Sequence, residues 1–129
     1  MYKQAVDYIK KYTQIVPNIG IILGSGLGEF GDIIEKSVYI DYINIPGFPT
    51  TTVSGHLGRF VMGQCCGKNV IAMQGRFHYY EGNTMDKVVM PVRVMKMLGV
   101  DTLICTNAAG GINPAFKPGD FMAITDHIN

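Results

Sequence analysis

Four side chains that can take part in chemistry stand within six positions, at Arg76, His78, Tyr80 and Glu81. An arginine carries a permanent positive charge, a histidine can donate or accept a proton, and a phenol or a carboxylate can form strong hydrogen bonds. They follow the apolar run 69–74 directly, which predicts a loop at the end of a buried strand. Because α/β proteins bind their ligands at such strand ends, we expect a binding or catalytic role for this loop.

A second candidate site is the turn 24–28, Gly-Ser-Gly-Leu-Gly, which follows the apolar run 19–23. Backbone N–H groups of a glycine-rich turn can converge on an anion, and the Ser25 hydroxyl adds a donor, so phosphate is the expected ligand. Residues 26–31 also fit the dinucleotide pattern G-x-G-x-x-G. However, the region 45–52 lacks the carboxylate that such a site requires. A purely structural turn is the remaining alternative.

Two further segments carry weaker signals. His56 and Arg59 are bracketed by glycines ahead of an expected strand, and their local pattern fits a site or plain solvent exposure equally well. The small-residue turn 107–111 follows the predicted buried strand 101–106. Such a turn lets a ligand approach the backbone closely, although a tight strand exit has the same composition.

The surrounding pattern predicts an α/β protein. Apolar spacing favours a short helix in the first residues and a second helix that begins after Thr84, ends at Gly99, and is kinked or restarted by Pro91. Apolar runs bounded by turns predict the strands, with a hairpin at Gly67-Lys68. The expected ranges are a helix at 2–13 and strands at 19–23, 37–43, 59–63, 69–74, 101–106 and 121–126.

Composition restricts the class of protein. The 129 residues are 47% hydrophobic and 16% charged, which suits one domain with one core. Eleven basic and ten acidic residues are spread without long runs, which argues against partners such as nucleic acid or a membrane surface. The sequence has no apolar signal segment at its start and no run of 18 apolar residues, so we expect a cytoplasmic chain. Cys65, Cys66 and Cys105 lack metal-type spacing and are expected to be reduced thiols.

Several motifs together resemble those of the trimeric purine nucleoside phosphorylases. The resemblance begins near residue 15 and corresponds to about the first half of a family member. It implies a phosphorylase/hydrolase-like three-layer α/β/α fold with a mixed central sheet, here truncated, in which residues 1–129 are one partial, phosphate-binding domain. The motifs are 24–28, 53–56, 75–82, 106–111 and 113–129.

The resemblance also implies an activity and a set of roles. Family members cleave the N-glycosidic bond of purine ribonucleosides and deoxyribonucleosides with inorganic phosphate, which serves purine salvage, and they require no cofactor and no metal. Glu81 matches a supporting residue, and its role is left open. By motif match, the phosphate ligands are Ser25, His56, Arg76, His78 and the backbone N–H of Ala108, the ribose contact is Tyr80, and the catalytic residue is His78.

The same resemblance predicts an incomplete catalyst. The side chains that contact the purine in this family have no counterpart in these 129 residues, so we expect little turnover by this chain. A cut sheet should also associate with itself or with a complementary piece, whereas the full-length enzymes are homotrimers. One alternative is a non-catalytic phosphate- or nucleotide-binding chain. Another is a methylthioadenosine phosphorylase, which the run 76–82 disfavours.

Overall fold

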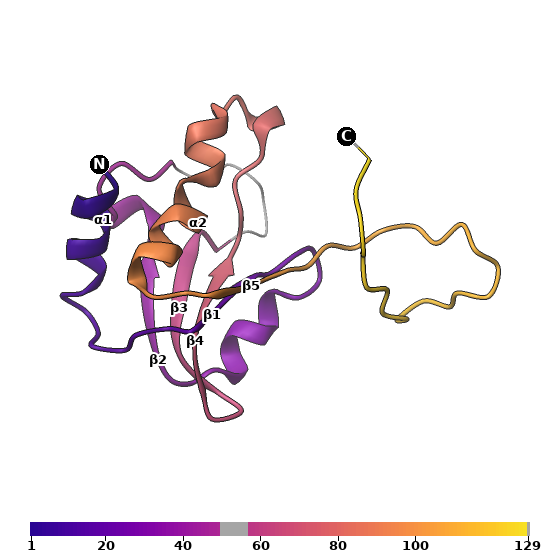
Figure 1. Ribbon diagram of the computed structural model, residues 1–129, viewed down its shortest axis with the longest axis horizontal. Helices are drawn as coiled ribbons and strands as arrows, with labels where there is room; N and C mark the ends of the chain where they lie inside the picture. Colours follow the sequence, from indigo (N-terminus) through magenta and orange to yellow (C-terminus); the bar gives the residue numbers. More distant parts are fainter. Residues whose placement is uncertain (50–56, 129) are drawn as a thin grey trace.

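The computed structural model describes residues 1–49 and 57–128 and contains one five-stranded mixed sheet, in the order β2-β3-β4-β1-β5 (Figure 1). This arrangement confirms the predicted α/β class. The strands are β1 (Ile19–Ile22), β2 (Glu35–Asp41), β3 (Arg59–Cys65), β4 (Lys68–Gln74) and β5 (Thr102–Cys105). The helices are α1 (Tyr2–Ile9) and α2 (Met85–Leu98), with short 3₁₀ turns η1 (Gly28–Ile33), η2 (Tyr42–Asn44) and η3 (Tyr79–Glu81).

Strand direction determines which loops meet. β1 runs parallel to both of its neighbours, β4 and β5, whereas β2, β3 and β4 form an antiparallel meander. The chain therefore leaves β4, crosses through α2 and returns as β5 on the far side of β1. As a result, the carboxyl ends of β4, β1 and β5 lie at one edge of the sheet, and the β3–β4 hairpin lies at the opposite edge.

Apolar side chains bury both faces of the sheet, but unequally. α1 and α2 cover one face, where their Ile9, Met90 and Met95 side chains join the strand residues Phe60 and Ile71 in the larger buried cluster (Figure 1). On the other face, in the described residues, a smaller cluster is covered by η1 and the residue that ends it. This cluster consists of Ile21, Leu23, Ile34, Val61, Val70 and Ala72.

Tyr42 is the polar centre of the larger cluster. Its ring lies 5.1 Å from the rings of Phe60 and Phe77 and 5.6 Å from that of Phe48, and its side chain is almost fully buried. Burial raises the pKa of the phenol well above its ordinary value, so the hydroxyl stays protonated. It donates a 2.9 Å hydrogen bond to the carbonyl of Gly75, at the start of the 75–82 loop. The core thus fixes the point where this loop leaves β4.

Most predicted elements are present, with two differences in the helices. The first helix ends at Ile9, because the apolar stripe that α2 buries ends there and Tyr12 is exposed. The second helix has its N-cap at Thr84 and its C-cap at Gly99, as expected, but it continues without interruption through Pro91, so the expected restart is wrong. Pro91 is at the seventh position of the helix and is buried against the core, and this packing offsets the hydrogen bond that it cannot make.

The predicted final strand at 121–126 is absent. Residues 107–128 leave β5 as an irregular segment that runs away from the sheet (Figure 1), and Phe121 is 98% exposed. A strand forms only where it can pair with a neighbour, and the described chain places none beside this segment. The apolar run on which the prediction rested was therefore not enough to form a strand. Neither α1 nor α2, the two α-helices of the described ranges, has the length and hydropathy needed to cross a membrane.

Replacing Tyr42 with phenylalanine should lower the free energy of unfolding by about 1–2 kcal/mol, because the buried Gly75 carbonyl loses its hydrogen-bond donor. Urea denaturation followed by circular dichroism measures this change. Tyr39→Phe is the matched control, since the Tyr39 ring is partly exposed on β2 and its hydroxyl has no partner in the described residues. Equal stabilities for the two variants would contradict the assigned role of Tyr42.

Candidate functional site

Thr106 connects the three loops that leave β1, β4 and β5. Its hydroxyl accepts a 2.8 Å hydrogen bond from the backbone N–H of Gly24 and donates one of 2.9 Å to the carbonyl of Ile22. Its own carbonyl accepts a 3.1 Å hydrogen bond from Nη1 of Arg76. One residue at the end of β5 therefore holds the glycine-rich turn and the arginine in a fixed relation.

The glycine-rich turn fits against β5 because it lacks a side chain at Gly24. A Cβ atom there would lie 2.5 Å from the carbonyl oxygen of Thr106 and 2.8 Å from Cα of Asn107, both backbone atoms that cannot move aside. The turn is closed by a 3.1 Å hydrogen bond from the Leu27 N–H to the Gly24 carbonyl. Gly26 has φ +82°, the left-handed value that a type II turn requires at its third position.

A small cavity opens beside this turn. It has a volume of about 80 Å³ and is lined by residues 23–26 with Gly28, Leu57, Gln74 and Gly75. A single water needs only about 10–15 Å³ by a comparable measure, so the cavity can take a small polyatomic ion. The N–H groups of Ser25 and Gly26 have no acceptor within the described chain. The turn thus offers donors beside a space of suitable size.

Arg76, His78 and Glu81 form a connected chain of hydrogen bonds. Nε of Arg76 donates to Nε2 of His78 over 3.2 Å, and Nδ1 of His78 lies 2.5 Å from Oε1 of Glu81. The same carboxylate oxygen accepts from the backbone N–H of His78 at 2.9 Å. Because a guanidinium can only donate, Nε2 must be the acceptor, and the ring proton lies on Nδ1. Glu81, only 5% exposed, therefore fixes the orientation and tautomer of His78.

The guanidinium of Arg76 is the electrostatic centre of this edge. It is partly buried, and no carboxylate of the described residues forms an ion pair with it. Nε and Nη1 are engaged by His78 and Thr106, whereas the two N–H groups of Nη2 have no acceptor in the same set of residues. A partly buried cation that has no carboxylate partner among the described residues, and that is connected to the glycine-rich turn through Thr106, is an environment that attracts an anion.

The remaining predicted site residues are placed less closely. The Tyr80 ring stacks on the ring of His78 at 4.7 Å and is 78% exposed. Ala108 is exposed two residues beyond Thr106, and within the described chain it makes no hydrogen bond to Ser25 or Arg76. His56 lies outside the described residues.

Arg59 is held by contacts to three other side chains. Its guanidinium lies 4.2 Å from the centre of the Tyr39 ring and 3.9 Å from a carboxylate oxygen of Asp32. Nε of Arg59 also donates a 2.6 Å hydrogen bond to Oε1 of Gln74. The side chain is therefore not freely exposed to solvent, and its hydrogen bond connects it to Gln74, which lines the candidate cavity.

The sequence analysis missed two residues that build the site, Thr106 and Gln74. The Gln74 side chain is 2% exposed, accepts from Arg59, and donates a 2.6 Å hydrogen bond from Nε2 to the carbonyl of Gly28. It thereby ties the end of the glycine-rich turn to β3 and β4. A signal was available, since a single amide at the end of an apolar strand must find hydrogen-bond partners if it is buried.

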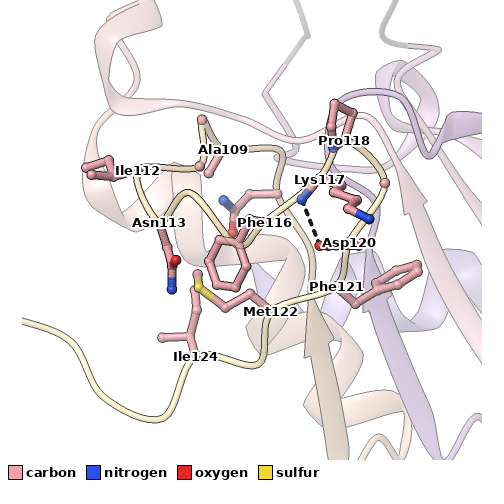
Figure 2. A pocket seen from close by; sticks show the side chains of 14 residues that line it. Ala109, Ile112, Asn113, Phe116, Lys117, Pro118, Asp120, Phe121, Met122 and Ile124 are labelled. Carbon is pink, nitrogen blue, oxygen red and sulfur yellow. Dashed lines mark hydrogen bonds between the residues drawn. The ribbon is translucent and has the colours of Figure 1, made fainter.

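A larger cavity of about 700 Å³ lies elsewhere, inside the irregular segment that follows β5 (Figure 2). All 14 residues that line it come from positions 107–124, and the hydrogen bond drawn there joins the backbone N–H of Lys117 to Asp120 at 2.8 Å. Figure 2 shows mainly apolar side chains around it, including Phe116, Met122 and Ile124. Arg76 and His78 line neither cavity, but the lining of the smaller one includes the glycine-rich turn and Gly75, the residue next to Arg76. We therefore place the candidate site at the smaller cavity.

Comparison with known proteins identifies relatives along almost the whole chain. Residues 18–129 match the model of the phosphorylase superfamily. Purine nucleoside phosphorylase 1 of Geobacillus stearothermophilus is 58% identical over 127 residues, which are 98% of this chain and 46% of the relative. Purine nucleoside phosphorylase of Rattus norvegicus is 48% identical over 128 residues, which are 99% of this chain and 44% of the relative. The chain thus spans less than half the length of these relatives.

Solved structures give the same result for the fold. Isoform 2 of purine nucleoside phosphorylase from Schistosoma mansoni, in complex with cytosine and ribose-1-phosphate, superposes with a TM-score of 0.84 at 52% identity, covering 92% of this chain and 42% of that one. The Schistosoma mansoni enzyme in complex with inosine gives a TM-score of 0.83 at 49% identity, covering 92% of this chain and 41% of that one. The sheet described above is therefore part of the fold of these enzymes.

Replacing Thr106 with valine should destabilise the protein by about 1–3 kcal/mol and speed amide exchange at Gly24, because the Gly24 N–H loses its acceptor while the side-chain volume is kept. Hydrogen exchange measured by NMR detects the local effect. Thr106→Ser retains the hydroxyl and should preserve the protection of Gly24. If the valine variant protected Gly24 as well as the wild type, the Thr106 connection would be disproved.

Proposed function

The chain belongs to the purine nucleoside phosphorylase family, and we propose that it forms the phosphate-binding part of an enzyme that splits purine nucleosides with inorganic phosphate. The products are the free base and ribose 1-phosphate or its deoxy form, as purine salvage requires. The observation that carries this proposal is the unneutralised guanidinium of Arg76, which Thr106 holds beside the open N–H groups of the glycine-rich turn.

Phosphate fits this arrangement of donors. It carries between one and two negative charges near neutral pH, and Nη2 of Arg76, which has no acceptor among the described residues, can meet one of its oxygens directly. The Ser25 hydroxyl and the N–H groups of Ser25 and Gly26 can bind a second oxygen. Each charge-assisted hydrogen bond contributes roughly 1.5–3 kcal/mol, so a few of them suffice to hold and orient the anion.

We assign the proton-handling role to His78. Its Nε2 carries a lone pair, which the protonated oxygen of monohydrogen or dihydrogen phosphate can meet once the bond from Arg76 is released. Transfer of a proton from dihydrogen phosphate to Nε2 would leave monohydrogen phosphate, and Glu81 would stabilise the resulting imidazolium through Nδ1. His78 thus adjusts the charge of the nucleophile while Glu81 keeps the ring in place.

The reaction itself depends mainly on positioning. A phosphate oxygen attacks the anomeric carbon as the bond to the purine nitrogen lengthens, and the sugar passes through a state with oxocarbenium character. An anion fixed beneath that carbon stabilises the positive charge and removes the entropic cost of bringing two reactants together. Tyr80 is the proposed ribose contact, and the exposure of its ring, which stacks on that of His78, supports this role. His56 and the N–H of Ala108 are further proposed phosphate ligands.

The length of the chain limits how much of the reaction it should perform. It spans 46% of the Geobacillus stearothermophilus relative, and in the described residues the cavity at the sheet edge is too small for a purine nucleoside. We therefore propose that residues 1–129 are one partial phosphorylase domain that binds phosphate and catalyses slowly at most. Assembly into a homotrimer and a cytoplasmic location belong to the same proposal and apply to the full-length enzyme.

Replacing Arg76 with alanine should weaken phosphate binding about 100-fold, the effect of losing two charge-assisted hydrogen bonds of roughly 1.5 kcal/mol each. Isothermal titration calorimetry with inorganic phosphate measures the affinity. Arg93→Ala is the matched control, because it removes the same charge from the exposed face of α2, where Arg93 contacts Tyr2 and Asp86. An unchanged affinity in Arg76→Ala, or an equal loss in both variants, would overturn the assigned site.

Phosphorolysis of inosine by this chain should be slower by orders of magnitude than that by a relative of full length, because no described group activates the leaving base. A coupled assay that oxidises the released hypoxanthine measures the rate at saturating phosphate. The Geobacillus stearothermophilus enzyme, prepared in parallel, provides the reference. Turnover at the reference rate would refute the proposed incompleteness and leave the phosphate site intact.

A further inference from the structure

Two adjacent cysteines occupy the turn of the β3–β4 hairpin, at the sheet edge opposite the candidate site. Cys65 is the last residue of β3, Cys66 follows it in the turn, and Cys65 pairs across the ladder with Lys68. Both thiols are free, and their Sγ atoms lie 4.0 Å apart. Neither the phosphate site nor the larger core cluster uses them.

Backbone conformation places both sulfurs on the same side of the chain. Neighbouring side chains of a regular strand point to opposite faces, which would separate the two thiols. Cys66 instead has φ +49° and Gly67 has φ +72°, the pair of left-handed values found in a two-residue type I′ turn. The reversal at Cys66 brings its Sγ back to that of Cys65.

Cysteine is an unusual choice for this position. The first central residue of a type I′ turn is ordinarily asparagine, aspartate or glycine, because these residues tolerate left-handed backbone best. Residues held in such a conformation despite their side chain are concentrated at functional sites. The turn therefore carries a thiol where a different residue would fold more easily, and the thiol is exposed and accessible.

The geometry suits a ligand that needs two sulfurs and no more. A separation of 4.0 Å is about twice the S–S bond length of 2.05 Å, so one bridging atom can stand between the two sulfurs. In the described residues, no group of three His, Cys, Asp or Glu side chains could hold a metal ion. The two cysteines therefore do not form a site for a cation such as Zn²⁺, which requires four protein ligands in a structural site. Trivalent arsenic that carries one organic group requires two thiolates only.

We propose that Cys65 and Cys66 form a dithiol site for trivalent arsenicals, separate from the phosphate site. The reaction with an arsenoxide breaks two S–H bonds and forms two As–S bonds, and the oxygen leaves as water with both protons. No atom changes its oxidation state. The product closes a small ring across the turn and leaves the register of β3 and β4 unchanged.

The two thiols differ in exposure, and we expect them to react with the arsenical one after the other. Cys65 packs partly against the smaller core cluster, and this burial raises the pKa of its thiol; the hydrogen bond to Cys66 and the charges of Cys66 and Glu35 raise it further. Cys65 therefore stays protonated at neutral pH and is held in place by packing. Cys66 is exposed and can meet the arsenical first, after which Cys65 completes the ring.

Incubation of the reduced chain with phenylarsine oxide should give a single adduct, heavier by one arsenical less one water in intact-mass spectrometry. A 1,2-dithiol should remove it, whereas a monothiol at the same concentration should not. Cys66→Asn should abolish the adduct and leave the melting temperature unchanged or higher, because asparagine suits the left-handed position. Cys65→Ser should also abolish it, and Cys105→Ser should retain it.

Three results would overturn the proposal: no adduct on the wild-type chain, an adduct that persists in Cys66→Asn, or an adduct that requires Cys105. Phosphate affinity measured on the arsenical adduct should equal that of the untreated chain, since the turn and the phosphate loops lie at opposite edges of the sheet. The outcome of this test is independent of whether the chain binds phosphate.

Discussion

The parallel alignment of β4, β1 and β5 is the constraint on which the candidate site depends. The segments that follow these strands begin at the same edge of the sheet, and the Thr106 hydroxyl and carbonyl join them to one another. The glycine-rich turn can approach the end of β5 this closely only because Gly24 has no Cβ atom, which would clash with the backbone of Thr106 and Asn107. Segments that are 82 positions apart in the sequence are thereby held within hydrogen-bonding distance.

Of the three arginines, only Arg76 has no carboxylate partner among the described residues. Arg59 pairs with Asp32 and lies over the Tyr39 ring, and Arg93 lies beside Asp86, whereas no described carboxylate pairs with Arg76. Glu81, the acidic group nearest to Arg76 in the sequence, is turned toward His78. The Glu81 carboxylate therefore orients His78 and does not neutralise Arg76. The positive charge of Arg76 remains available to attract an anion.

The local sequence pattern predicted most of the helices, strands and turns. It could not predict which strands pair with one another. The hairpin, the boundaries of α2 and the strand before each loop follow from apolar spacing and from residues with strong turn or capping preferences. The order of the strands in the sheet could not be predicted in this way, because the sequence of one strand does not indicate which other strand it pairs with. The same limit explains the absent strand at 121–126 and the missed role of Thr106, whose partners are distant in the sequence. The open question at Arg59 also required its contacts in space.

The central claim is that three loops at one sheet edge form a single anion site, and an NMR titration of the intact chain with inorganic phosphate tests it most directly. The account predicts saturable shifts in the backbone amides of Ser25 and Gly26 and in the side-chain signals of Arg76 and His78, all with one common dissociation constant. Sulfate in place of phosphate, at matched ionic strength, separates specific binding from a general salt effect. Shifts confined to other parts of the chain, or different dissociation constants for the different loops, would contradict the account.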